Sequence, residues 1–399
     1  MFAEKIEHVS LENILLLIGM KTLDIEFLAG QISMLECVDS GLVYRNPAPH
    51  LRAVHAWHPS LARLDNGEFL AAFDLGQGAE SLDYRTYTSR SRDDGQTWDA
   101  PVRLFEDSVE RRSTHSIRIS RTSDGDLVGF GSRFYRDDPT VGLVNHTNLG
   151  YVPMDLLFLR STDDGRSWSC RTIQAPLIGP AFETCHSIVA LREGRWLAPT
   201  STWRGWNGDD PNGMQAIALV SHDRGATWPE YLKVMDGYSR GIIYWEQSLI
   251  ELSDGRLLAV CWAFQERSGE SLPTPYTLSA NGQTFSAPRP TGLQGQTAKL
   301  VSLQDGRILC VYRRHDRPGL WASLAKIEGD SWINLADLCL WRGATSGMTG
   351  MNSPGEELSA LKFGFPSLIQ LPGGDIFVVF WCSENCINNI RWLRIRVNS

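Results

Sequence analysis

Six apolar segments spread along the chain begin with a polar or aromatic side chain, and three or four of these starting positions carry a titratable group. The positions are His58, His115 with Ser116, Cys185 with His186, Glu246, Thr297 and Phe365. A carboxylate can act as acid, base or nucleophile, and a neutral imidazole can act as a base near pH 7. One such residue in a strand is usually structural. Several at equivalent points of successive segments indicate a shared site.

Glu246 is the carboxylate best placed for chemistry. It follows Tyr244 and Trp245, and apolar surroundings raise the pKa of a carboxyl group or let it polarise a partner. Glu183 precedes the neighbouring segment and could form a pair with it. Paired carboxylates hydrolyse glycosides with retention at a separation of about 5 Å and with inversion at about 6.5–9.5 Å. We therefore predict Glu246 and Glu183 as catalytic, with Tyr244 beside them.

Each of these segments belongs to a predicted β-hairpin. Six stretches consist of an apolar strand, a tight turn with glycine and a second apolar strand, which is typical of hairpins. The turns recur roughly every 60 residues, as expected of a repeat architecture. Their glycines are Gly67, Gly125, Gly194, Gly255, Gly306 and Gly374.

A second motif is interleaved with the hairpins. The pattern S-x-D-x-G-x-[T/S]-W occurs at Ser91–Trp98, Ser161–Trp168 and Ser221–Trp228, with weaker copies at 279–285 and 325–332. Asp and Gly favour a folded-back turn, and the tryptophan can fill a gap between neighbouring sheets. We interpret Asp93, Asp163 and Asp223 as turn-forming residues.

Together the two motifs predict the fold. Each period then holds four antiparallel strands, and six periods arranged around a channel form an all-β, six-bladed β-propeller. We place an N-terminal extension at residues 1–33 and the propeller at 34–399. Residues 34–54 or the final 389–397 are expected to supply the outer strand of the last blade and close the ring.

Strand alternation predicts which end of the propeller carries the site. The glycine turns and the Asp turns share one face, so the opposite face receives the starts of the inner strands and the longer loops. Loops on a rigid scaffold are where binding and catalysis concentrate. These loops are 74–86, 131–150, 203–213, 262–275, 313–319 and 381–388.

The repeated Asp turns and x-D-G-x-L hairpins resemble the sialidase superfamily of six-bladed propellers over about residues 50–397. In that family the Glu that opens the E-x-S-x-x-E-L-x-D-G-R strand assists the nucleophile, and Glu246 matches it. The family's acid/base Asp lies in the first long loop, which here contains Asp74 and Asp83. By this resemblance we predict Asp83 as the acid/base and assign Asp74 the role of holding the loop.

The chain departs from the family at the residues that bind sialic acid. The resemblance implies three arginines and a nucleophilic Tyr, but the expected R-I-P motif reads Trp57-His58-Pro59 and the second arginine position is Trp262. The Tyr position is Phe363 or Phe365. Ordinary sialidase activity is therefore not expected. Arginines that could still lie near the end of the propeller that carries the longer loops are Arg118, Arg133, Arg204, Arg240 and Arg313 or Arg314.

Three functions remain open from the sequence. The first is an exo-acting glycoside hydrolase using Glu246 and Glu183, as in exo-arabinanases of similar fold. The second is a polysaccharide lyase, or another histidine-dependent enzyme, acting on a uronate-containing glycan. The third is a non-catalytic sugar-binding propeller. The predicted sugar-stacking side chains are Trp57, Trp203, Trp206, Tyr244, Trp245 and Trp262.

The lyase alternative would use His58, His115 and His186 with Tyr244 and an arginine, because a neutral histidine can abstract a proton near pH 7. Three histidines around one opening could also hold a divalent metal, but their spacing is long-range and we predict no metal or cofactor. His58 and His186 remain predicted catalytic residues, and His115 a predicted substrate-binding residue.

Composition limits the partners. The chain has 399 residues, 42% hydrophobic and 21% charged, and a net charge of −8 without a basic run, so a nucleic-acid partner is not expected. No segment approaches a membrane span, and the N-terminal region fits a signal peptide poorly. We expect a cytoplasmic protein with a carbohydrate substrate; the oligomeric state is left open.

Overall fold

The computed structural model describes residues 33–107, 109–176, 179–343 and 360–398. Apart from Ser33, the predicted N-terminal extension lies outside these residues. Within them the elements are β-strands and one short 3-10 helix, η1 (Tyr238–Arg240). The described part contains no helix with the length and apolarity needed to span a bilayer.

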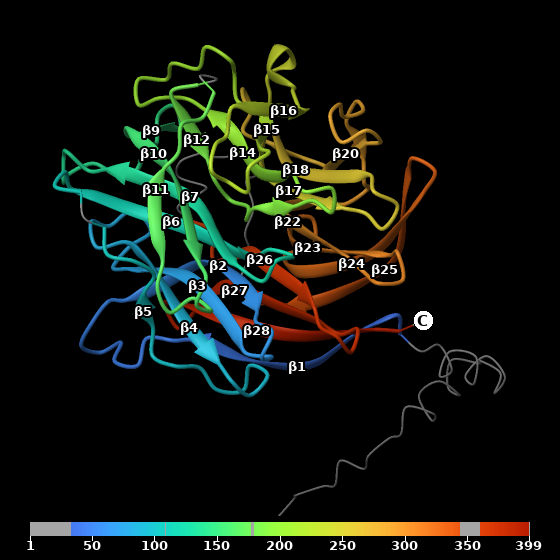
Figure 1. Cartoon of the computed structure of the whole chain (residues 1–399), viewed down its shortest axis with the longest axis horizontal. Helices are drawn as coiled ribbons and strands as arrows, with labels where there is room; N and C mark the ends of the chain where they lie inside the picture. The colour runs from blue at the N-terminus through green and yellow to red at the C-terminus, as the bar shows by residue number, and fades with distance from the viewer. Residues whose placement is uncertain (1–32, 108, 177–178, 344–359, 399) are drawn as a thin grey trace, which may run out of the picture.

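Six antiparallel sheets follow one another in chain order around a common centre (Figure 1). The first sheet has the order β2-β3-β4-β5, and the second β6-β7-β10-β11. The bounds in the first are β2 (His55–Arg63), β3 (Phe69–Gly76), β4 (Arg85–Ser91) and β5 (Val102–Arg103). Those in the second are β6 (Ser113–Arg121), β7 (Leu127–Tyr135), β10 (Met154–Ser161) and β11 (Ser169–Thr172).

The third and fourth sheets each add a short extra strand to the same plan. The third contains β12 (Ala181–Glu183), β13 (Val189–Ala190), β14 (Trp196–Trp203), β15 (Ala216–Ser221) and β16 (Glu230–Met235). The fourth contains β17 (Ile242–Glu251), β18 (Leu257–Gln265), β19 (Ser271–Leu272), β20 (Pro275–Ser279) and β21 (Arg289–Pro290). A separate small hairpin between β7 and β10 consists of β8 (Val144–Asn145) and β9 (Gly150–Tyr151).

The last two sheets complete the ring. The fifth contains β22 (Gly295–Ser302), β23 (Ile308–Arg314), β24 (Gly319–Glu328) and β25 (Ser331–Trp341). The sixth contains β26 (Phe363–Gln370), β27 (Ile376–Glu384), β28 (Ile387–Val397) and, as its outer strand, β1 (Leu35–Tyr44). The prediction of a six-bladed propeller of four-stranded antiparallel blades is confirmed, and the segment 34–54 supplies the closing strand.

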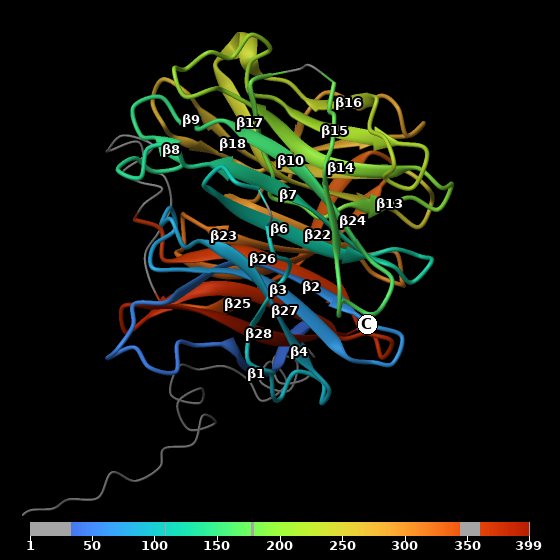
Figure 2. The same cartoon turned by 60° about the vertical axis from the view of Figure 1, so that its left-hand side comes forward.

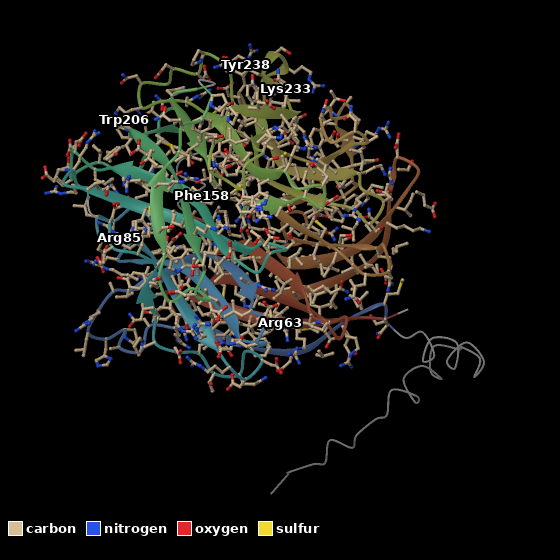
Figure 3. All side chains as sticks on the ribbon, in the orientation of Figure 1. Arg63, Arg85, Phe158, Trp206, Lys233 and Tyr238 are labelled. Carbon is tan, nitrogen blue, oxygen red and sulfur yellow. The ribbon has the colours of Figure 1, made fainter. Side chains whose placement is uncertain are left out.

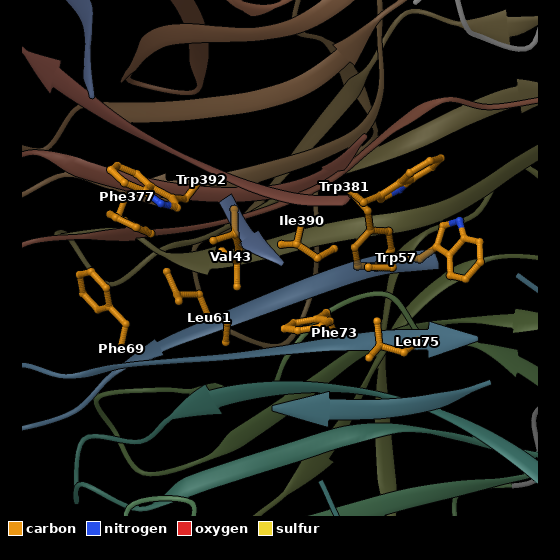
Figure 4. Packing of buried hydrophobic residues seen from close by; sticks show 14 of the residues in the cluster. Val43, Trp57, Leu61, Phe69, Phe73, Leu75, Phe377, Trp381, Ile390 and Trp392 are labelled. Atoms are coloured by element: carbon orange, nitrogen blue, oxygen red, sulfur yellow. The ribbon is translucent and has the colours of Figure 1, made fainter. Parts of the chain in front are cut away.

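The core lies between the blades. Apolar side chains of the first and sixth blades interdigitate, with Phe69 and Phe73 on one side and Phe377 and Trp392 on the other (Figure 4). The rings of Phe69 and Phe377 are 4.6 Å apart. Comparable clusters fill the other junctions, and in Figure 3 Phe158 lies in the interior while Lys233 and Tyr238 stand at the periphery. This packing makes the blades a rigid support for their loops.

The glycine turns and the Asp turns lie at one end of the propeller, as predicted. Asp124, in the turn of the second blade, pairs at 3.1 Å with Arg224, in the Asp turn of the third. Arg256 of the fourth blade likewise contacts Asp330 of the fifth. The loops between second and third strands form the opposite end, which we call the mouth. In Figure 2 the β8–β9 hairpin of the mouth is on the left, and β13 is on the right.

Candidate functional site

Four of the six inner strands carry a β-bulge at an equivalent position near the mouth. The register shifts between Trp57 and Ser60 in β2, and at matching points in β17, β22 and β26. Each bulge contains a non-glycine residue of positive φ, a conformation that carries strain and re-aims the side chain. The φ values are 47° for His58, 43° for Glu246, 49° for Thr297 and 49° for Phe365.

Three of these four bulge residues line a cavity of ≈ 400 Å³ at the mouth. Its walls come from the first, second, third, fourth and sixth blades and combine aromatic rings with charged groups. Such a mixture is typical of small-molecule sites. Among the lining side chains are Trp57, His58, Glu80, Tyr84, Ser116, Arg118, Tyr151, Glu183, Trp245, Glu246 and Phe365.

Glu246 presents an unsatisfied acceptor in this cavity. Its Oε2 atom is buried and has no hydrogen-bond partner among the residues that the structure describes. Beneath it, Trp245 packs on Trp262 with ring centroids 4.5 Å apart, and the guanidinium of Arg313 lies 5.1 Å over Trp262. Burying a polar group without a partner is unfavourable, so an orphaned carboxylate oxygen in a cavity marks a place where a ligand or water would bind.

Glu183 stands beside Glu246 and differs from it in environment. Glu183 ends β12 and is 7% exposed, and its Oε2 accepts a hydrogen bond of 3.1 Å from the backbone N–H of Glu246. Burial and the neighbouring Glu246 carboxylate raise the pKa of Glu183 to about 7, against the opposing influence of Lys299. A carboxyl group with this pKa retains a proton near neutrality.

Lys299 forms part of the floor below the pair. Its Nζ donates to the backbone oxygens of Gln247 at 3.0 Å and Glu246 at 3.4 Å, and lies 3.7 Å from the thiol of Cys185. The same ammonium is 5.1 Å from the ring of Phe365. The cation therefore supports the bulge of Glu246 from below and offsets negative charge.

A buried network around Asp74 forms the wall on the side of the first blade. Its carboxylate is fully buried and accepts hydrogen bonds from Tyr84, Thr86, Ser116 and Arg118 at 2.6–3.0 Å. Burial alone would raise the pKa of Asp74, but Arg118 and the hydrogen bonds hold it well below its usual value.

A family model described as "BNR repeat-like domain" matches residues 67–378. The chain belongs to this BNR-repeat family. The match covers the stretch from the first glycine turn to the second strand of the sixth blade, and so includes the repeated turns and both glutamates of the site.

Solved structures share the fold of this BNR-repeat propeller. A Dyadobacter fermentans protein of unknown function is 20% identical, with a TM-score of 0.70 over 92% of this chain and 100% of that one. The NanB sialidase of Streptococcus pneumoniae is 14% identical, with a TM-score of 0.63 over 90% of this chain and 70% of that one. No curated protein sequence matches the chain.

A Trypanosoma rangeli sialidase in complex with sialic acid is 13% identical, with a TM-score of 0.59 over 86% of this chain. Here the propeller spans only 54% of the other chain. At these identities the comparisons show a sialidase-like propeller fold, and chemistry must be argued from the residues of this chain.

The structure brings six of the predicted site residues together. The cavity lining includes Trp57, His58, Arg118, Glu183, Trp245 and Glu246. They come from four different blades, which explains why no short motif joins them in the sequence.

His115 lies away from the cavity, contrary to the prediction. It is 1% exposed and packs on Phe105 with ring centroids 4.5 Å apart, between the first and second blades. Burial lowers its pKa to about 4. Successive residues of a strand point to opposite faces, and on β6 it is Ser116 and Arg118 that line the cavity.

His186 lines a different cavity, in the central channel below the floor. Its Nδ1 lies 2.7 Å from the backbone oxygen of Ser187 and its Nε2 3.3 Å from Ser248 Oγ. Burial and Lys299 lower its pKa to about 3, as for a structural imidazole. Among the residues that the structure describes, no three His, Cys, Asp or Glu side chains form a group suited to a metal ion.

Asp83 and Tyr244 also lie outside the cavity. Asp83 is exposed and accepts a hydrogen bond of 3.1 Å from the backbone N–H of Gln77, so it shapes its own loop. Tyr244 is buried in the cluster between the third and fourth blades, on the face of β17 opposite Trp245. Neither reaches the glutamate pair.

The remaining predicted binding residues do not line the cavity. Arg133 pairs with Asp107 at 2.6 Å, Arg204 pairs with Asp210 at 2.8 Å, and Arg240 is exposed on η1. Trp203 stacks on Trp245 at 5.1 Å, and so, with Trp262 and Arg313, supports the lining from behind.

Sequence reasoning missed Tyr84 and Tyr151 and gave Asp74 only a minor role. Tyr151 is carried into the cavity by the β8–β9 hairpin, and burial raises its pKa, with Glu183 and Glu246 adding to the effect. Nothing in the local sequence marks this tyrosine. Asp74 could have been found, because it is an acid inside the fully buried strand β3.

Proposed function

We propose that this BNR-repeat propeller is a glycoside hydrolase that removes a terminal sugar, with Glu183 and Glu246 as its catalytic residues. The observation that carries the proposal is the difference between the two carboxyl groups. Glu183 has a pKa raised to about 7, while the neighbouring Glu246 is half-buried, lines the cavity and keeps one buried oxygen without a partner among the described residues. Two adjacent carboxyl groups in unlike environments are the arrangement that glycoside hydrolysis requires.

In this mechanism protonated Glu183 donates its proton to the glycosidic oxygen as the bond to the anomeric carbon breaks. Carboxylate Glu246 either attacks that carbon or takes a proton from the water that attacks it. In the first case Glu183, now ionised, activates water in a second step. Both routes leave one glutamate protonated and one ionised, as at the start.

The shape of the cavity supports action at a chain end. Phe365 and Arg118 line both the mouth cavity and the channel cavity beneath it, so they stand at the boundary between the two. A pocket closed below accommodates a terminal sugar better than the middle of a polymer. The rings of Trp57, Tyr151 and Trp245 offer apolar faces to a sugar.

The test is a panel of fluorogenic arabinosides, rhamnosides, fucosides, galactosides and sialosides, with the variants Glu183→Gln and Glu246→Gln as controls. We expect the wild-type protein to release the fluorophore from at least one glycoside and both variants to lose this activity. Proton NMR of the first released anomer would distinguish retention from inversion. Turnover in both variants equal to that of the wild-type protein would overturn the proposal.

A uronate polymer followed by ultraviolet absorbance tests the lyase alternative in the same panel. One contact favours that alternative: His58 and Tyr84, a base and an acid, lie 2.7 Å apart at the edge of the cavity. An unsaturated uronate product would transfer the chemistry to this pair and leave Glu246 without a catalytic role.

A further inference from the structure

The side chain of His58 is held by a hydrogen-bonded chain that ends at a buried ion pair. Its Nδ1 lies 2.7 Å from the hydroxyl of Tyr84. That hydroxyl donates to Asp74 Oδ2 at 2.9 Å, and Arg118 Nη2 donates to the same oxygen at 3.0 Å. The ring of His58 is also fixed edge-on to Phe365, with centroids 5.0 Å apart.

Counting protons along this chain fixes the tautomer of His58. Asp74 is a carboxylate that accepts four donors, so it can only accept. Tyr84 has one hydroxyl proton and uses it to donate a hydrogen bond to Asp74. Its oxygen must therefore accept the hydrogen bond at its contact with His58 Nδ1. The proton between Tyr84 and His58 therefore belongs to Nδ1 of the imidazole.

The other ring nitrogen is then a free acceptor at the cavity. In a neutral imidazole with Nδ1 protonated, Nε2 carries a lone pair. Within the described residues Nε2 of His58 makes no hydrogen bond, and 32% of the side chain is exposed. His58 lines the cavity, on the blade diametrically opposite Glu246.

The two arginines nearest the site are engaged within the protein. Arg118 contacts Asp74, Ser116 and the backbone oxygen of Ile117. Arg313 donates to Gln296 and to the backbone oxygen of Phe363. Besides these engaged arginines, the charged groups of the lining are the carboxylates Glu80 and Glu246 and one exposed lysine, Lys362, which offers no planar fork to a carboxylate, while Glu183 retains its proton near neutrality. A carboxylate on the ligand would meet this acidic lining without a free bidentate partner.

We propose that Nε2 of His58 is a subsite that accepts a hydrogen bond from a hydroxyl group of a neutral sugar, and that Tyr84 and Asp74 are positioning residues that fix its tautomer. The inference rests on the proposed function, because it names the substrate class of the same cavity. A site built to accept from a hydroxyl discriminates against ligands that lack it.

Nitrogen NMR of protein labelled with ¹⁵N-histidine tests the tautomer without any substrate. We expect His58, assigned with His58→Gln, to show a protonated Nδ1 and an unprotonated Nε2 at neutral pH. Tyr84→Phe should weaken this preference, because only Asp74 Oδ2, 3.5 Å from Nδ1, would remain as an acceptor, whereas Tyr87→Phe, a change of the same type three residues on in β4, should preserve it. Protonation at Nε2 in the wild-type protein would overturn the proposal.

The subsite is tested by adding L-arabinose, L-rhamnose, L-fucose and D-galactose, and then D-glucuronate and N-acetylneuraminate, to the labelled protein. At least one neutral sugar should shift the Nε2 resonance, and neither acid should do so. Shifts caused only by the acids, or by none of the sugars, would overturn the subsite.

These outcomes separate the subsite from the proposed function. A neutral sugar that shifts Nε2, with no glycoside cleaved, would refute the hydrolase and leave the subsite intact. Turnover of a glycoside whose sugar leaves Nε2 unchanged would refute the subsite alone. For a cleaved glycoside, Tyr84→Phe should raise KM by about three- to tenfold, the value of one hydrogen bond, with kcat within about twofold.

Discussion

The two ends of the propeller use carboxylates in opposite ways. In the Asp turns Asp93, Asp163 and Asp223 each accept from a Ser hydroxyl, a backbone N–H and a Thr or Ser hydroxyl. The corresponding distances differ by no more than 0.1 Å: 2.8–2.9 Å, 2.8–2.9 Å and 2.6–2.7 Å. At the mouth, Glu246 leaves one oxygen without a partner and Glu183 has a raised pKa.

The comparison divides the carboxylates of this protein into a group that stabilises turns and a group that is available to a ligand. A carboxylate whose oxygens are all hydrogen-bonded has a lowered pKa and holds a turn, as Asp163 does with a pKa of about 2. A carboxylate that the fold leaves incompletely satisfied is available to a ligand. Exposure alone would not identify the carboxylates that are available to a ligand, because the aspartates of the Asp turns are, as a group, the more exposed.

The largest effect should come from Glu246→Gln. The substitution keeps the shape of the side chain and removes the charge, so we expect turnover of any cleaved glycoside to fall at least about a thousandfold. Because no hydrogen bond to Oε2 is lost, the free energy of unfolding should change by less than about 1 kcal/mol. Kinetics and urea denaturation measure the two quantities. A large loss of stability would place Glu246 with the structural carboxylates.

Glu183→Gln should reduce turnover by about a hundred- to ten-thousandfold, as expected for a general acid.

The Glu183→Gln substitution should also remove a pH dependence of stability. In the wild-type protein the pKa rises from 4.5 to about 7 on folding, so the proton favours the folded state. The free energy of unfolding should therefore fall as the pH rises from 4.5 to about 7, by up to about 3 kcal/mol. Urea denaturation across this range should show the decline in the wild type and its absence in the variant; a decline in both would assign it to other groups.

Asp163→Ala should affect stability alone. The loss of the turn's hydrogen bonds should lower the free energy of unfolding by about 1–3 kcal/mol, without changing kcat per folded molecule. The contribution of Asp163 is complete above its ordinary pKa of 3.8 and is lost as the pH falls through about 2. Asp223→Ala is the matched control and should cost a similar amount. A changed kcat would contradict the division between the two ends.

The smallest effect should come from Asp83→Asn. Because Asp83 is exposed and contacts only its own loop, we expect changes below about 0.5 kcal/mol in stability and about twofold in turnover. A turnover loss comparable to that of Glu183→Gln would restore Asp83 as the acid, as the sialidase resemblance implies.

The fold could be predicted because its signals are local and repeated. Each glycine turn and Asp turn is encoded within a few residues, and Gly67 and its five equivalents all have positive φ. The equivalence of His58 and Glu246 was also visible in the sequence, because the repeat aligns them. The bulge that they share was not, since it is an irregularity in pairing with the next strand.

The site could be predicted only where the repeat fixed the direction of a side chain. His115 was misplaced because β6 lacks the bulge found in β2 and β17, so the side chain at this position faces the neighbouring blade. Asp83 was preferred to Asp74 because loop position was known and burial was not. Tyr151 reaches the cavity through a hairpin that belongs to no repeat.

The pairing of β1 with β28 also determines the order of events during synthesis. Leu35 lies opposite Val397 and Tyr44 opposite Ile390, so the sixth sheet joins the first strand of the described residues to the last. The ring cannot close until β28 has left the ribosome, and the first strand must wait unpaired while five blades form. The same junction brings Ser33 and Asn398 within hydrogen-bonding distance, 2.7 Å. A circularly permuted gene that joins Ser33 to Asn398 through a short linker and begins translation at a glycine turn would therefore move the closing junction: a start at Gly67 would make β2 the final strand, and the ring would close when β2 pairs with β3.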